Sequence, residues 1–204
     1  MQRTEVSRED DVRQLVAPAD KEFGRLDCIF NNAGFGGALG PIADTRVDDF
    51  DVTFAVLVRG VSLGMKHAAP LLCRQGGSMI STASVAGLLA GYSPHAYASA
   101  KAAASQLSRS HAPDLAPHRV RVNCICPGFI ATPLALNTVG RTPSEAQREA
   151  AKSWMSKSQP IPRPGEPDDI AQMALWLASV ASSFVTGQQI VGDEGFAAGR
   201  AWYE

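Results

Sequence analysis

Short apolar runs alternate with helical patterns along the whole 204-residue chain, and this alternation constrains the fold more than any other feature. Short apolar runs between turn signals are typical of strands buried in a parallel sheet, whose crossover connections are usually helices. The sequence therefore predicts an α/β fold, with a doubly wound parallel sheet of four strands and helices on both faces. The length suits a single domain over residues 1–204.

The four predicted strands lie at residues 26–31, 78–82, 120–126 and 188–191. Gly76-Gly77 precedes the second strand and Pro127-Gly128 ends the third, because glycine and proline interrupt regular structure. The first strand would lie at the edge of the sheet, although its apolar sequence suits an interior position. An edge of this kind favours poor solubility or pairing with another chain.

Five helical segments are predicted between and around these strands. The first has Ser7 as its N-cap and ends at Phe23-Gly24. Thr142-Pro143-Ser144-Glu145 resembles a capping box with proline at the first helical position, and it opens the fourth segment. The segments cover residues 7–23, 47–72, 94–115, 142–155 and 167–178.

Charge and composition exclude several classes of partner. The chain carries 19 Lys and Arg against 20 Asp and Glu, a net charge of −1. Such a chain has no excess positive charge to attract nucleic acid or an anionic membrane, and no apolar run approaches a membrane span of roughly 18 residues. The N-terminus lacks an apolar signal stretch, so we expect a cytoplasmic protein. The cysteines lack CxxC or metal-ligand spacing, which predicts reduced core thiols and no metal site; they are Cys28, Cys73, Cys124 and Cys126.

The segment Tyr97-Ala98-Ser99-Ala100-Lys101 is the sharpest candidate for chemistry. A spacing of four residues puts the phenol and the ammonium on the same face of a helix. Because a nearby positive charge favours the phenolate, the pKa of Tyr97 should fall toward working pH, as a general acid or base requires. The alternative is a solvated helix face, on which the same spacing arises by chance.

Three further segments follow predicted strands, at the carboxyl edge where open α/β sheets bind ligands. Ser84 follows the second strand, and its hydroxyl can hydrogen-bond a carbonyl oxygen that Tyr97 protonates. Asn31-Asn32-Ala33-Gly34 ends the first strand, and Pro127-Gly128 ends the third. Small residues there let a flat ligand approach the backbone. Taken alone, each of these segments could equally be an ordinary turn.

Together these segments resemble the short-chain dehydrogenase/reductase family. Essentially the whole chain takes part in the resemblance, and the motifs that carry it occur in the family's order and spacing: Asn31-Asn32-Ala33-Gly34, Ser84, Tyr97-x-x-x-Lys101, Asn123 and Pro127-Gly128. The resemblance implies a Rossmann-like sheet, incomplete at its N-terminal side. It also implies NAD- or NADP-dependent hydride transfer between a secondary alcohol and a ketone.

The resemblance further implies roles for individual residues. Tyr97 would donate or accept the proton, Lys101 would lower its pKa and bind the nicotinamide ribose, and Ser84 would orient the carbonyl. The adenosine half of the cofactor site would be lined by Asn31, Ala33 and Gly34, and the nicotinamide half by Pro127, Gly128, Ile130 and Thr132. Residues 134–160, with Trp154 and Met155, resemble the family's variable substrate lid. The two long helices imply a homo-oligomer, a dimer or tetramer.

The chain also departs from the family pattern. It lacks the initial strand–helix–strand unit with its Gly-x-x-x-Gly-x-Gly phosphate loop. Leu57 stands at the position of the family's active-site Asn, and Glu194 replaces a usual glycine. Pro113 should interrupt the helix that begins near Tyr97, because proline removes a helical hydrogen bond.

Three hypotheses follow from the resemblance and the departures. The first is an enzyme that acts on a small secondary alcohol or ketone. The second is a truncated, catalytically impaired relative that serves as a non-catalytic binding or assembly partner. The third is a folded α/β fragment without activity.

Overall fold

A four-stranded parallel sheet forms the centre of the structure, a computed structural model that describes residues 2–135 and 142–202. The strands lie in the order β1-β2-β3-β4, which confirms the predicted α/β class and places β1 at an edge. The predicted strand limits differ from the observed ones by one or two residues. The observed strands are β1 (Cys28–Asn31), β2 (Gly77–Thr82), β3 (Val120–Pro127) and β4 (Gln189–Gly192).

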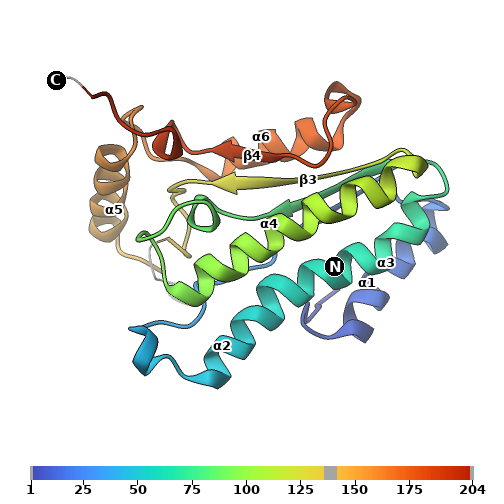
Figure 1. The fold of residues 1–204 in the computed structure, drawn as a ribbon, viewed down its shortest axis with the longest axis horizontal. Helices are drawn as coiled ribbons and strands as arrows, with labels where there is room; N and C mark the ends of the chain where they lie inside the picture. The colour runs from blue at the N-terminus through green and yellow to red at the C-terminus, as the bar shows by residue number, and fades with distance from the viewer. Residues whose placement is uncertain (1, 136–141, 203–204) are drawn as a thin grey trace.

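Helices cover both faces of this sheet, as predicted (Figure 1). Helices α3 and α4 pack on one face, α6 packs on the other, and α1 packs against α3. Helix α5 lies beyond the carboxyl ends of the strands, at the left in Figure 1. The helices are α1 (Glu9–Phe23), α2 (Val47–Phe54), α3 (Gly60–Leu72), α4 (His95–Leu115), α5 (Glu145–Ser158) and α6 (Pro167–Ala178).

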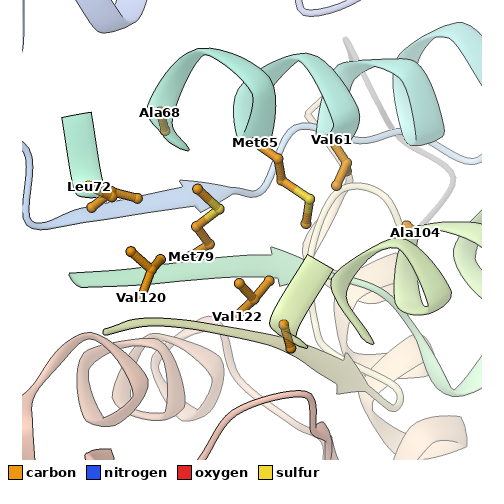
Figure 2. Close-up of a cluster of buried hydrophobic side chains, with 9 residues drawn as sticks. Val61, Met65, Ala68, Leu72, Met79, Ala104, Val120 and Val122 are labelled. Carbon is orange, nitrogen blue, oxygen red and sulfur yellow. The ribbon is translucent and has the colours of Figure 1, made fainter. Parts of the chain in front are cut away.

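The main core lies between the sheet and the pair α3 and α4. Met79 of β2 and Val122 of β3 face Met65 and Leu72 of α3 and Ala104 of α4 (Figure 2). All five side chains are buried. A second cluster on the other face joins Ile80, Ile125 and Leu177. Because side chains alternate along a strand, Met79 and Ile80 point to opposite faces, and the sheet is buried on both sides.

Two predicted helix starts are wrong. Helix α1 has Arg8 rather than Ser7 at its N-cap, because the backbone N–H and hydroxyl of Ser7 both donate to the Glu5 carboxylate. The N-cap of helix α5 is Ser144, two residues after Thr142, where the predicted capping box begins. There Ser144 Oγ accepts from the Gln147 N–H, and Gln147 Oε1 accepts from the Ser144 N–H at 2.9 Å. This reciprocal pair satisfies two N-terminal donors at once.

The two long predicted helices differ in continuity. The segment 47–72 is helical throughout, but a π-helical stretch, Ala55–Arg59, separates α2 from α3. Helix α4 runs to Leu115 with Pro113 in its last turn, so the predicted interruption is wrong. Proline there removes only the bond to Arg109, and the Ala116 N–H still closes the turn on Ala112. None of the helices in the described part of the chain is long and apolar enough to span a membrane.

Candidate active site

A cavity of about 630 Å³ opens at the carboxyl ends of the strands. This is the edge at which parallel α/β sheets bind ligands. Eight of the ten predicted site residues line it: Gly34, Ser84, Tyr97, Lys101, Pro127, Gly128, Ile130 and Thr132. Segments from three strand ends and one helix therefore meet at one cavity, and their roles in it stay predictions.

Tyr97 and Lys101 lie one turn apart on α4, on the face turned toward the sheet. Lys101 is 4% exposed, and its ammonium donates to the backbone oxygen of Thr82 at 2.7 Å. Its Nζ lies 5.7 Å from the centre of the Tyr97 ring. The spacing of four residues thus brings the two groups together, as predicted, and Lys101 keeps further N–H donors beside the cavity.

Ser84 is held against this helix by the short 3₁₀ turn that it caps, Val85–Gly87. A Cβ on Gly87 would lie 2.7 Å from the Ala102 backbone nitrogen, so the close approach of the turn to α4 requires glycine. Ser84 Oγ accepts from the Ala86 N–H at 3.1 Å, which leaves the hydroxyl hydrogen free to donate. The Ser84 side chain also lies near the Tyr97 phenol.

The protonation states differ from the prediction. Burial raises the pKa of Tyr97, and the nearby Ser84 side chain opposes this rise only in part. Burial also lowers the pKa of Lys101 to about 8, against smaller opposite effects from Cys126 and Cys124. The expected fall of the Tyr97 pKa is therefore wrong, because loss of solvation is the largest cause and Ser84 opposes it only in part.

Leu57 lies near the Lys101 ammonium. A Cβ built on Gly34 would lie 3.4 Å from Leu57 Cδ2 and 3.7 Å from Lys101 Nζ, so the three residues meet at one point. Leu57 is fully buried and belongs to the π-helical stretch, a deviation that is frequent at functional sites. A buried apolar side chain therefore lies near the Lys101 ammonium.

Asn31 and Ala33, the other two predicted site residues, do not line the cavity. Asn31 packs against α3, where a Cβ on Gly64 would lie 2.0 Å from its Oδ1. Its neighbours Phe30 and Asn32 line the cavity instead, because successive side chains of a strand point to opposite faces. Asn32 Oδ1 accepts from the Thr82 hydroxyl at 2.7 Å. A cofactor contact by Asn31 or Ala33 stays a prediction.

The segment after β3 is fixed by backbone bonds to two other loops. The Gly128 N–H donates to Gly192 at the end of β4, and the Ala131 N–H donates to Gly165 at 2.8 Å. Asn123 lies below this segment, wholly buried, and its amide bridges Val185 and Gln188. Asn123 therefore ties β3 to the approach to β4.

Glu194, at the same end of β4, has φ 53°, in the left-handed region that glycine favours. This backbone agrees with the glycine expected there from the family pattern. The Glu194 carboxylate pairs with Arg163.

Four aromatic rings form a connected cluster, three of them lining the cavity, and we call the cluster the aromatic wall: Tyr92, Phe129, Trp154 and Phe196. Phe129 contacts Trp154 at 4.7 Å and Phe196 at 5.0 Å between ring centres, and Phe196 contacts Tyr92 at 4.7 Å. Sequence reasoning singled out only Trp154. The other rings come from segments far apart in the chain, so no local pattern reveals them.

The predicted absence of a metal site rests on spacing alone. Within residues 2–135 and 142–202, no group of three His, Cys, Asp or Glu side chains could hold a metal ion. All four cysteines are free thiols, and Cys124 and Cys126 are buried. Part of the predicted substrate lid, residues 136–141, lies outside the described residues.

Comparisons with known proteins agree with this geometry. A family model described as enoyl-(acyl carrier protein) reductase matches residues 2–197. Xanthoxin dehydrogenase of Arabidopsis thaliana is 38% identical over 203 residues, which cover 94% of this chain and 69% of the relative.

Solved structures share the fold. Levodione reductase superposes with a TM-score of 0.87 at 32% identity, covering 97% of this chain and 76% of that one. A short-chain type dehydrogenase/reductase from Mycobacterium marinum superposes with a TM-score of 0.83 at 31% identity, over 95% and 74% of the two chains.

The parallel sheet and its flanking helices define a Rossmann-like α/β protein. The chain belongs to the short-chain dehydrogenase/reductase family, a family of oxidoreductases whose relatives include enzymes that act on CH–OH groups.

Proposed function

We propose that this chain interconverts a secondary alcohol and a ketone with NAD or NADP as the redox partner. One observation carries the proposal: Ser84, Tyr97 and Lys101 line one cavity, and the Ser84 side chain lies near the Tyr97 phenol. In that arrangement two hydroxyl donors could meet one carbonyl oxygen.

The residues around Lys101 suit the nicotinamide-ribose end of the cofactor. The buried ammonium uses one N–H on Thr82, and its remaining donors could bind ribose hydroxyls. Gly34 on one side, and Pro127, Gly128, Ile130 and Thr132 on the other, would flank the group. When bound, the cofactor supplies or accepts the hydride.

The phosphate end has less support in the described residues. The Gly34–Gly37 loop lines part of the cavity but leads into a short 3₁₀ turn, Ile42–Asp44, rather than an α-helix. It therefore lacks the helix N-terminus that commonly binds a pyrophosphate.

In the direction of reduction, Tyr97 donates its proton to the substrate oxygen, and Ser84 donates a hydrogen bond to the same atom. The raised pKa of Tyr97 keeps the phenol protonated at neutral pH, as this direction needs. The Lys101 ammonium stabilises the phenolate that remains. In the direction of oxidation, the Tyr97 phenolate accepts the proton of the alcohol hydroxyl, and Ser84 keeps its hydrogen bond to the same oxygen.

A second candidate is a catalytically impaired relative that binds or assembles without turnover. Leu57 favours it, because a buried leucine beside Lys101 offers no polar group to the ammonium. A homo-oligomer, dimer or tetramer, through the two long helices stays a prediction in either case.

Turnover separates the two candidates. Reduction of cyclohexanone by NADH and by NADPH is followed through the nicotinamide absorbance, in the wild-type chain and in Ser84→Ala. Loss of one oriented donor to a developing oxyanion should lower kcat by about 10²-fold. No turnover with either cofactor supports the impaired relative, and equal rates in Ser84→Ala contradict the role of Ser84.

A further inference from the structure

We infer that the substrate of this cavity is an uncharged ketone or secondary alcohol with a bulky apolar body, its oxygen at Ser84 and Tyr97 and its apolar body against the aromatic wall. The inference rests on the proposed function for the position of the oxygen. It adds the substrate class, which the proposed function leaves open.

The first support is the charge of the cavity. Among the described residues that line it, Lys101 is the only charged side chain. Lys101 is 4% exposed and already donates to Thr82, and the proposed function assigns its other donors to the ribose. No described cation is therefore left to pair with a carboxylate or phosphate on the substrate, and an unpaired charge in an apolar site is costly.

The second support is the separation of polar and apolar lining. Ser84, Tyr97 and Lys101 line the cavity beside β2 and α4. Another part of the lining is apolar and comes from Leu134, Met155 and three rings of the aromatic wall, Tyr92, Phe129 and Trp154. Such a site fits a molecule with one oxygen at one end and an apolar body at the other.

The third support is the geometry of the aromatic wall. Its three ring contacts all have interplanar angles between 65° and 81°, the edge-to-face arrangement that aromatic pairs favour. Each ring is thereby held by another, so the surface is set before a ligand arrives. A rigid apolar surface binds a compact ring system without a large cost in side-chain ordering.

The fourth support is exposed apolar area at the mouth of the cavity. Tyr92 and Trp154 each leave more than half of their surface exposed although both line the cavity. A bulky apolar ligand would cover part of these rings, and burial of apolar area contributes about 25 cal/mol per Å². A small ligand at Ser84 and Tyr97 would leave the rings exposed.

The test uses three ketones that share one ring: cyclohexanone, 4-tert-butylcyclohexanone and 4-oxocyclohexanecarboxylate. Each competes for the full chain against an uncharged fluorescent ketone, 6-propionyl-2-(dimethylamino)naphthalene, whose emission shifts to the blue in apolar sites. This readout needs neither cofactor nor turnover. We expect the tert-butyl ketone to bind at least tenfold more tightly than cyclohexanone, and the carboxylate at least tenfold more weakly than the tert-butyl ketone.

Two tryptophan variants provide the matched comparison. Trp154→Ala removes one ring of the aromatic wall, whereas Trp176→Ala removes a partly exposed tryptophan of α6 that does not line the cavity. We expect Trp154→Ala to weaken binding of the tert-butyl ketone by about fivefold or more, and binding of cyclohexanone by less than twofold. Trp176→Ala should change neither.

Equal affinity for the carboxylate and the tert-butyl ketone would overturn the inference, as would equal effects of the two tryptophan variants or a dye that does not bind. Failure of the proposed function looks different. The affinities would then follow the expected order, but none of the ketones would be reduced. Turnover of all three ketones with similar kcat/KM would support the proposed function and contradict the substrate class.

Discussion

The two ends of the cavity are built in different ways. Ser84, Tyr97 and Lys101 lie between the central strands and α4; Ser84 is 9% exposed and Lys101 is 4% exposed. At the other end, the loop after β1 follows an edge strand, and Leu39 on that loop is 70% exposed. The first end is packed by several elements, whereas the second follows an edge strand and is more exposed. Chemistry that needs precise placement is therefore better supported at the first end.

Loss of the phenol should have the largest effect at the central end. Tyr97→Phe keeps the ring and removes the transferable proton, so reductase activity should fall by about 10²–10⁴-fold. The measurement is kcat for cyclohexanone reduction by the wild-type chain and by Tyr97→Phe at the same pH. Dye binding and the melting temperature serve as controls for an intact cavity. A rate equal to wild type would show that another group supplies the proton.

The affinity for the cofactor tests whether the end of the cavity at the loop after β1 binds more weakly than the end at Lys101. A chain of these 204 residues should bind NADH with a dissociation constant of about 1 mM or weaker. Two or three missing charge-assisted bonds to the phosphates, at about 1.5–3 kcal/mol each, weaken a micromolar site by roughly a thousandfold or more. Calorimetric titration of the purified chain measures this constant.

Half-molecules of the cofactor sharpen that comparison. Reduced nicotinamide mononucleotide carries only the half that Lys101 would bind, so it should bind within about tenfold of NADH. ADP-ribose carries the other half and should bind more weakly. Micromolar affinity for NADH or ADP-ribose would contradict the comparison, and would show that a segment such as 34–40 binds the phosphates.

The sequence predicted the central end better than the edge. Tyr97, Lys101 and Ser84 could be placed because helix periodicity and the strand-end rule act over short distances. The orientation of Asn31 could not, since the observed strand starts at Cys28 and its phase depends on pairing with β2. The aromatic wall could not be predicted, because its rings come from distant parts of the chain and contact one another only in the folded structure.

The sign of the Tyr97 pKa shift could not be predicted for a related reason. Spacing shows that an ammonium is near the phenol, but it does not show how deeply the two are buried. Here burial is the largest cause for both groups. The depth of a site is a property of the whole fold, whereas the pairing of two side chains on one helix is local.

The pH dependence of the central end gives the next prediction. Lys101 has a pKa of about 8, so the ammonium is lost above that pH and the rate of ketone reduction should fall there. Leu57→Asn replaces the adjacent apolar wall with an amide that can accept from the ammonium, which favours the charged form. The falling limb should move up by about one unit, worth about tenfold in rate on that limb.

Leu57→Met is the matched control, because it keeps an apolar side chain and should keep the limb near pH 8. The other titratable groups beside Lys101 are Tyr97, whose pKa burial raises, and the Cys124–Cys126 pair of β3. Cys124→Ser should leave the limb in place. A limb that moves with Cys124→Ser, or not at all with Leu57→Asn, would assign it to another group.

Thermal stability gives a readout of the same shift without turnover. The pKa of Lys101 is lower in the folded chain than its usual 10.5. Between pH 8 and 10.5 the unfolded chain therefore binds more protons, and this group makes stability rise with pH. The rise should be smaller in Leu57→Asn than in Leu57→Met, as melting temperatures across that range would show.

At the other end of the cavity, the loop after β1 is bound by one buried hydroxyl, that of Thr53. Thr53 of α2 is wholly buried; its Oγ1 accepts from the Ala38 N–H at 2.9 Å and donates to the Asp49 carbonyl at 2.7 Å. The loop approaches closely at this point, since a Cβ on Gly37 would lie 2.8 Å from the Thr53 methyl. Thr53→Val keeps the shape and leaves the Ala38 N–H without its partner, which should cost about 1 kcal/mol of stability.

Thr53→Ser keeps the hydroxyl and loses a methyl, so it separates the hydrogen bond from packing. Urea unfolding measures both variants. If the Thr53 hydroxyl holds the loop after β1 in place, Thr53→Val should also weaken the binding of ADP-ribose. Binding of reduced nicotinamide mononucleotide should not change, because the variant affects only that loop. Equal weakening of both halves by Thr53→Val would mean that the loop and the Tyr97 end of the cavity move as one body, and the contrast between the two ends would then be wrong.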